Sequence, residues 1–231
     1  MLLNMSYKWW ILIAVGLFGI GFGIGVALTL AMPATIANLL SEELAALREL
    51  SALLGPFKVT TAIFIFLKNV SALLLSFIFS PILCLLPILA LTVNGLLLSF
   101  ISTIVAQEES LGFVLVGLLP HGIFELPALI IGEAAALSFG AMVIVFLLRK
   151  ESRTVLVSTV KQSVGHILLA LTLFLTVGIF HAIIVIALFK EETRIPLMAN
   201  LKRNLRYLVI AFALLVPAAI IETYVTPLLL T

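Results

Sequence analysis

Long apolar runs, separated by only a few charged or proline-containing turns, most limit how this 231-residue chain can fold. The run at residues 9–31 can span a bilayer, because about 20 helical residues cross the hydrocarbon core. Hydrophobic residues make up 63% of the chain and charged residues 10%, and the mean hydropathy is +1.33. Soluble domains are about half apolar and a quarter charged. We therefore predict an all-α, polytopic helix bundle in the cell membrane, with residues 1–231 forming one integral membrane domain.

The composition also excludes several classes of function. A formal net charge of +2 gives no basis for a nucleic-acid partner. Cys84 is the single cysteine, so the chain has no internal disulfide and no cysteine cage for zinc. The sequence contains no HExxH, Walker or GxSxG motif, and no aspartate for an aspartyl dyad. These signatures of common enzymes are absent, so a non-enzymatic role is favoured.

Glycines recur at helical spacing in the first apolar run. Gly19 and Gly23 lie four residues apart, as do Gly21 and Gly25. Pairs of small residues at this spacing let a second helix approach closely within a membrane. We expect this helix to pack against another helix, and the chain to form a homo-oligomer, with a dimer favoured.

The later apolar runs predict the remaining spans of the bundle. Residues 57–105 would form two spans, because Pro81 and Pro87 interrupt a run that is too long for one. Further spans are predicted at residues 164–189 and from residue 207 to the C-terminus. Together with the first run and a central apolar segment, this gives five or six crossings.

Residues 38–54 have a different pattern from the spans. Their leucines recur at helical spacing, with glutamates and an arginine between them. An apolar stripe with charged residues on the other face is typical of an amphipathic helix. We therefore predict an interfacial helix here, lying on the membrane or against another helix.

The central segment at residues 111–148 is too long for one crossing and barely long enough for two. Pro120, Gly122 and Pro127 fall in its first half. A residue before proline is pushed away from helical geometry, which predicts a break at Glu125 and Leu126. We expect a short, re-entrant arm to about residue 119, an irregular turn, and a full helix that begins at Pro127.

Polar residues within the apolar runs are the candidate functional residues. Ionisable groups at membrane depth are costly, so they persist mainly where they pair, line water or function. His121 and Glu125 would lie about 6 Å apart on one helix face. Glu222 is a further candidate acid. Asn69 and Asn94 are expected to form hydrogen bonds between helices, and Lys68 is expected to be a counter-ion for Glu125 or Glu222. Glu133 is expected to lie beside Lys68 or a water-filled pocket.

Several functions fit this set. The first is a channel or transporter-like site for a cation or proton, formed by His121, Glu125, Glu222 and the two asparagines. The second is a scaffold without catalytic activity, in which the same residues hold the helices together and a membrane-protein partner binds. The third and most remote is an intramembrane hydrolase that uses a metal. No cofactor is expected other than a metal cation, for which His121, Glu125 and Glu222 are the possible ligands.

Three stretches together resemble a known family. Residues 120–128 read PHGIFELPA, residues 66–74 read FLKNVSALL, and residues 221–227 read IETYVTP. They are similar to the motifs of the stage II sporulation protein M family, and Asn94-Gly95 matches a further position. The family pattern often has paired asparagines where this chain has Lys68 and Asn69. The resemblance implies a multispanning membrane protein with a polar site. The sporulation member of the family works with a membrane-anchored peptidoglycan-remodelling enzyme.

Overall fold

The computed structural model describes residues 5–31, 55–82, 84–148 and 191–230. Within these residues the chain is helical and has no strand, which confirms the all-α prediction. In the part of the chain that the structure describes, five helices are long and apolar enough to cross a membrane. They are α1 (Tyr7–Ala31), α3 (Val59–Phe79), α4 (Leu85–Glu108), α5 (Leu111–Leu148) and α9 (Glu191–Tyr224), followed by the short α10 (Thr226–Leu229).

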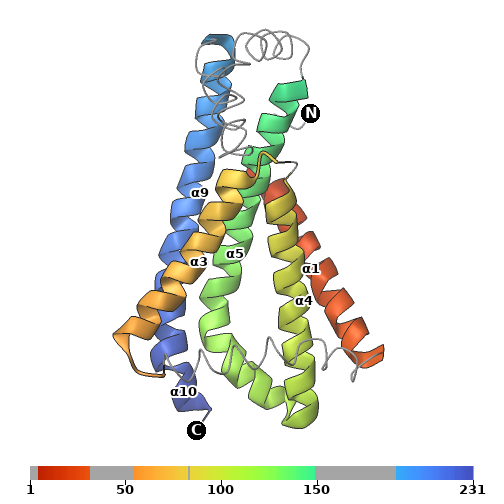
Figure 1. The fold of residues 1–231 in the computed structure, drawn as a ribbon, viewed down its shortest axis with the longest axis vertical. Helices are drawn as coiled ribbons and strands as arrows, with labels where there is room; N and C mark the ends of the chain where they lie inside the picture. The colour runs from red at the N-terminus through yellow and green to blue at the C-terminus, as the bar shows by residue number, and fades with distance from the viewer. Residues whose placement is uncertain (1–4, 32–54, 83, 149–190, 231) are drawn as a thin grey trace, which may run out of the picture.

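The five long helices form one bundle in which neighbours in sequence alternate in direction (Figure 1). α1, α4 and α9 run one way, and α3 and α5 run the other way (Figure 1). The two spans predicted within residues 57–105 are confirmed as α3 and α4. The last helix begins at Glu191, well before the predicted residue 207, because the charged residues there continue the helix beyond the apolar run. The amphipathic helix predicted at residues 38–54 and the span predicted at 164–189 lie outside the described residues.

α5 is the central helix, in contact with each of the other long helices. Its residues 132–140 are all buried, and most of them are small. An alanine at Gly140 would meet the backbone of Ser80 at the end of α3, and one at Gly132 would meet Leu73. Without a hydrophobic force between helices in lipid, close packing of small residues is a main source of attraction. The small residues of α5 therefore explain why the other helices gather around it.

The helix predicted from Pro127 is in fact longer, and the predicted irregular turn at Glu125 and Leu126 is wrong. α5 is helical throughout, with Pro120 and Pro127 inside it. Each proline lacks an amide hydrogen and pushes against the preceding turn, so it bends a helix. Figure 1 shows the first part of α5 inclined to the rest. In a membrane a bend costs less than an open turn, because a turn would expose more unpaired backbone groups. The arm before the bend is thus part of the helix, and a separate re-entrant element is not observed.

α1 packs mainly on α4, and glycines let their backbones touch. An added Cβ at Gly21 would meet the carbonyl of Thr92, and one at Gly25 would meet Leu96 and Ser99. Gly95 lies equally close to the backbone of Phe18. One of the two predicted glycine pairs, Gly21 with Gly25, therefore packs within the chain. The other pair differs, because nothing described lies within 4 Å of a Cβ added at Gly19 or Gly23.

This difference predicts opposite effects for two matched substitutions. Gly21→Ala should lower the free energy of unfolding by about 1–3 kcal/mol, because its methyl group overlaps the α4 backbone. Gly19→Ala should be neutral or slightly stabilising, because alanine is the better helix former by about 1 kcal/mol. Thermal unfolding of both variants in detergent tests this. Equal melting temperatures for the two variants would contradict the packing of α1 on α4.

Candidate functional site

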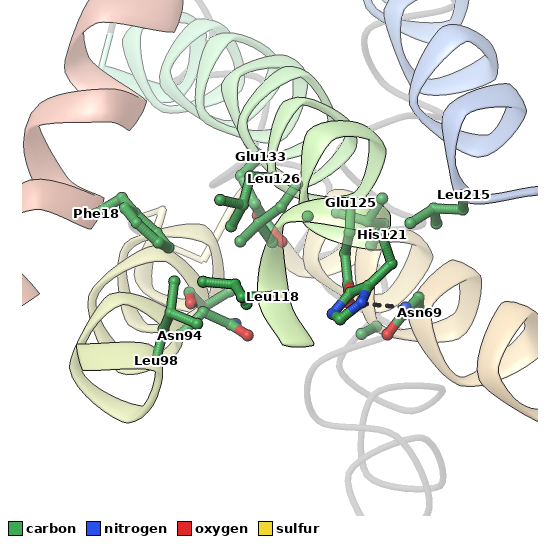
Figure 2. A pocket seen from close by; sticks show the side chains of 15 residues that line it. Phe18, Asn69, Asn94, Leu98, Leu118, His121, Glu125, Leu126, Glu133 and Leu215 are labelled. Atoms are coloured by element: carbon green, nitrogen blue, oxygen red, sulfur yellow. Dashed lines mark hydrogen bonds between the residues drawn. The ribbon is translucent and has the colours of Figure 1, made fainter. Parts of the chain in front are cut away.

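The polar residues of α3 and α5 meet between the two prolines of α5. Asn69 Nδ2 donates a hydrogen bond to Glu125 Oε1 over 3.0 Å. Figure 2 shows this bond together with His121, one turn earlier on α5. A carboxylate in an apolar surrounding needs such a donor, since burial of an unpaired polar group costs several kcal/mol on hydrocarbon scales. The interhelical bond predicted for Asn69 is therefore observed, and its acceptor is the central acid of the site.

Beside this bond lies a cavity of about 210 Å³, here called the inner cavity. Three helices contribute its polar lining, and its remaining walls are apolar (Figure 2). A polar cavity of this size holds several water molecules, since one water needs roughly 10–15 Å³ of such space and two to four polar partners. Its polar side chains are those of Asn69 on α3, Asn94 on α4, and His121, Glu125 and Glu133 on α5.

A second cavity, of about 430 Å³, is also lined by Asn69 and Glu125 and is called the outer cavity. It lies at the end of the bundle where α3 begins and α10 is found (Figure 1). Lys68 and Glu222 line it, together with Thr223 and Thr226. Glu222 interacts electrostatically with both Glu125 and Lys68. Lys68 and Glu222 therefore line the same cavity as Glu125, the acid that they were predicted to accompany.

Asn69 and Glu125 line both cavities, so their hydrogen bond forms part of the wall between them. His121 lines the inner cavity, and its Nδ1 atom lies 3.3 Å from Thr226 Oγ1, which lines the outer one. Side chains from α5 and α10 therefore also approach each other across this boundary. The predicted site residues are consequently divided between two chambers, with Glu125 common to both.

Glu133 is the most buried acid among the described residues, with 1% of its surface exposed. Ser76 on α3 donates a hydrogen bond to its Oε2 atom. The sequence placed Glu133 beside Lys68 or a water-filled pocket; it faces the inner cavity, and its hydrogen-bond partner is Ser76. Ser76 was missed, although its spacing from Asn69 carried a signal. Seven residues are about two helical turns, so both side chains point to the same face of α3.

The hydrogen bond of Asn94 differs from the one that was predicted. Asn94 faces the inner cavity, but its amide donates to Ala90 O of its own helix over 2.7 Å. The interhelical bond predicted for Asn94 is therefore not observed.

Pro120 and Pro127 lie in the bend of α5, and Gly122 between them lines the inner cavity. These three residues affect the shape of the helix at the site, whereas the ionisable groups of the site belong to neighbouring residues.

The possible metal ligands do not form a metal site in the described part of the chain. No group of three or more His, Cys or Glu side chains there is placed to hold an ion. This corrects the expectation that His121, Glu125 and Glu222 share a metal. The physical reason is that His121 turns toward Thr226, while Glu125 is held by Asn69.

A second polar cluster, at the interface of α5 with α1 and α9, was not identified from the sequence. Tyr7 OH donates to Ile131 O over 2.6 Å, and the Tyr7 ring stacks on that of Tyr207. Arg203 Nη2 donates to Ser138 Oγ over 3.4 Å. Such bonds between helices stabilise membrane bundles. This cluster joins α1 and α9 to α5 at Ile131 and Ser138, on either side of Glu133.

The family model of stage II sporulation protein M matches residues 13–191. The match includes the segments at 66–74 and 120–128 and ends before the one at 221–227. No curated protein and no solved structure matches significantly.

The hydrogen bond of Glu125 predicts a difference between the two asparagines. Asn69→Ala should lower the free energy of unfolding by about 1–3 kcal/mol, because it leaves a partly buried carboxylate without its donor. Asn94→Ala is the matched control, and should cost less because its amide bonds only within α4. Thermal unfolding in detergent measures both. A larger loss of stability in Asn94→Ala than in Asn69→Ala would show that the Asn69–Glu125 hydrogen bond is not a main stabilising interaction of the bundle.

Proposed function

The chain belongs to the stage II sporulation protein M family, and on this premise we propose a channel- or transporter-like function for it. In this proposal it is a multi-pass protein of the cell membrane whose polar core binds and conducts a cation or proton. Membership of the family and five apolar helices support an integral membrane protein. The finer proposal rests on how the polar side chains are arranged.

One observation carries the proposal: Glu125 lines two cavities at once, and each contains further ionisable groups. A carboxylate used only to join helices needs a donor, but it does not need a cavity on both sides. At membrane depth, ionisable residues that line polar cavities are typical of ion pathways and proton relays. Glu222 and Lys68 on one side of Glu125, and Glu133 on the other, extend the polar groups along the bundle.

A scaffold is the second candidate, because the bonds of Asn69 with Glu125 and of Ser76 with Glu133 also join α3 to α5. In this alternative the polar core serves stability alone. The exposed glycines Gly16, Gly19 and Gly23 of α1 would then be available to a second copy of the chain or to a membrane-protein partner. The two candidates differ in whether ions cross the membrane.

Ion flux in lipid vesicles separates the candidates. Purified protein reconstituted into vesicles should pass protons or monovalent cations down an imposed gradient, and Glu125→Gln should reduce that flux at least tenfold. The glutamine keeps the size of the side chain and a hydrogen-bond acceptor, but cannot ionise. The matched control is Glu108→Gln at the exposed end of α4, which should retain the flux.

Two results would contradict the conducting function. One is equal flux in wild type and Glu125→Gln. The other is no flux in the wild type, with a lower melting temperature of Glu125→Gln in detergent, which is the behaviour of a scaffold.

A further inference from the structure

We infer that the conducted species is the proton, and that Glu222, Glu125 and Glu133 are successive proton sites along the bundle. This inference rests on the proposed function and specifies its ion. It uses three acids on two helices: one in the outer cavity, one in the wall between the cavities, and one at the inner cavity. Ser76 and Asn69 hold two of these acids in place.

The wall between the cavities favours a proton over a larger ion. Asn69 Nδ2 and Glu125 Oε1 are in direct contact at 3.0 Å, so no ion fits between them. A metal cation would have to displace this bond and bring its oxygen ligands with it. A proton needs no such opening, because a carboxyl group can accept it on one side and release it on the other. The Asn69 bond occupies Oε1 and leaves Oε2 for the proton.

The charged side chains at the outer cavity also favour a proton over a metal cation. Lys68 lines this cavity with Glu222, and the two side chains interact electrostatically. A lysine ammonium repels metal cations that approach the acids beside it. A proton can still reach Glu222 by hopping between water and carboxyl oxygens, so that no solvated cation has to rest beside the ammonium. The outer cavity therefore combines an acid that can take a proton with a charge that disfavours other cations.

The inner cavity connects the second acid to the third. Glu125 and Glu133 are eight residues apart, which is about 12 Å along a helix. That distance is too long for a direct hydrogen bond, but three or four water molecules at about 2.8 Å spacing bridge it. Both acids line the inner cavity, which is polar and large enough to hold such a chain. Glu133 is almost completely buried, so the cavity is its contact with mobile protons.

Each step balances in atoms and charge. Water in the outer cavity passes a proton to the Glu222 carboxylate, which becomes a neutral acid and then transfers it to Glu125. Glu125 releases the proton to the first water of the inner cavity and returns to the carboxylate that Asn69 binds. The water chain passes the proton to Glu133, whose neutral acid keeps its bond from Ser76. Glu133 then gives the proton up to water and returns to the carboxylate, so that each acid ends the cycle in the state in which it began. No oxidant, reductant or metal takes part.

The test measures ion selectivity and the role of Glu133 in the same vesicles. Vesicles that enclose a pH-sensitive dye report proton uptake, and vesicles that enclose sodium- or potassium-sensitive dyes report the other cations. Wild type should pass protons and neither metal ion. Glu133→Gln and Glu222→Gln should each reduce proton uptake at least tenfold, Glu133→Asp should recover part of it, and Glu108→Gln should not change it.

The outcomes distinguish this inference from the proposed function. Sodium or potassium flux that equals or exceeds proton flux overturns the inference, while the conducting function stands. The absence of any flux in the wild type overturns both. Full proton uptake in Glu133→Gln removes Glu133 from the path. The selectivity of the wild type is measured without any variant, so the inference stays falsifiable even if Glu133→Gln fails to fold.

Discussion

The hydrogen bond between Asn69 and Glu125 connects the fold of this protein to its chemistry. In lipid there is no water to solvate a carboxylate, so the surrounding helices must supply its partners. Asn69 supplies one partner and thereby sets where α3 lies along α5. The same register brings Ser76 to Glu133. Ser76 follows Asn69 on α3 by about two helical turns, and Glu133 follows Glu125 on α5 by about two turns as well. One constraint therefore positions two acids and forms part of the wall between the two cavities.

The shape of α5 determines where this constraint acts. Beyond the bend, its small buried residues let the other helices pack closely. At the bend, Pro120 and Pro127 incline the first part of the helix, and Gly122 lies at the inner cavity. The close packing on one side and the bend on the other leave space for the inner cavity, and the Asn69–Glu125 pair lies at that transition. The helix thus combines a packed core and a polar chamber in one element.

The proposed conducting path and the alternative structural clamp would use the same side chains of this bundle. The bonds that Asn69 and Ser76 donate stabilise the packing of α3 on α5 in either case. What favours conduction is the arrangement around those bonds. Acids lie on both sides of Glu125, each beside a cavity, and Lys68 is placed where it would repel larger cations. Variants that keep side-chain volume, such as glutamine for glutamate, are therefore needed to separate the proposed conduction from stability.

The sequence by itself determined the class of the fold, because the cost of burying charges and unpaired backbone in lipid leaves few alternatives to apolar helices. It also identified Asn69, His121, Glu125, Glu133 and Glu222, since polar residues stand out in apolar runs. It could not show that α5 bends at its prolines without breaking, or that Ser76 is the partner of Glu133. Those features depend on which helices lie side by side and in what register. Only the tertiary structure decided that Glu125 separates two cavities, because a cavity is formed by several helices together and has no pattern in any one of them.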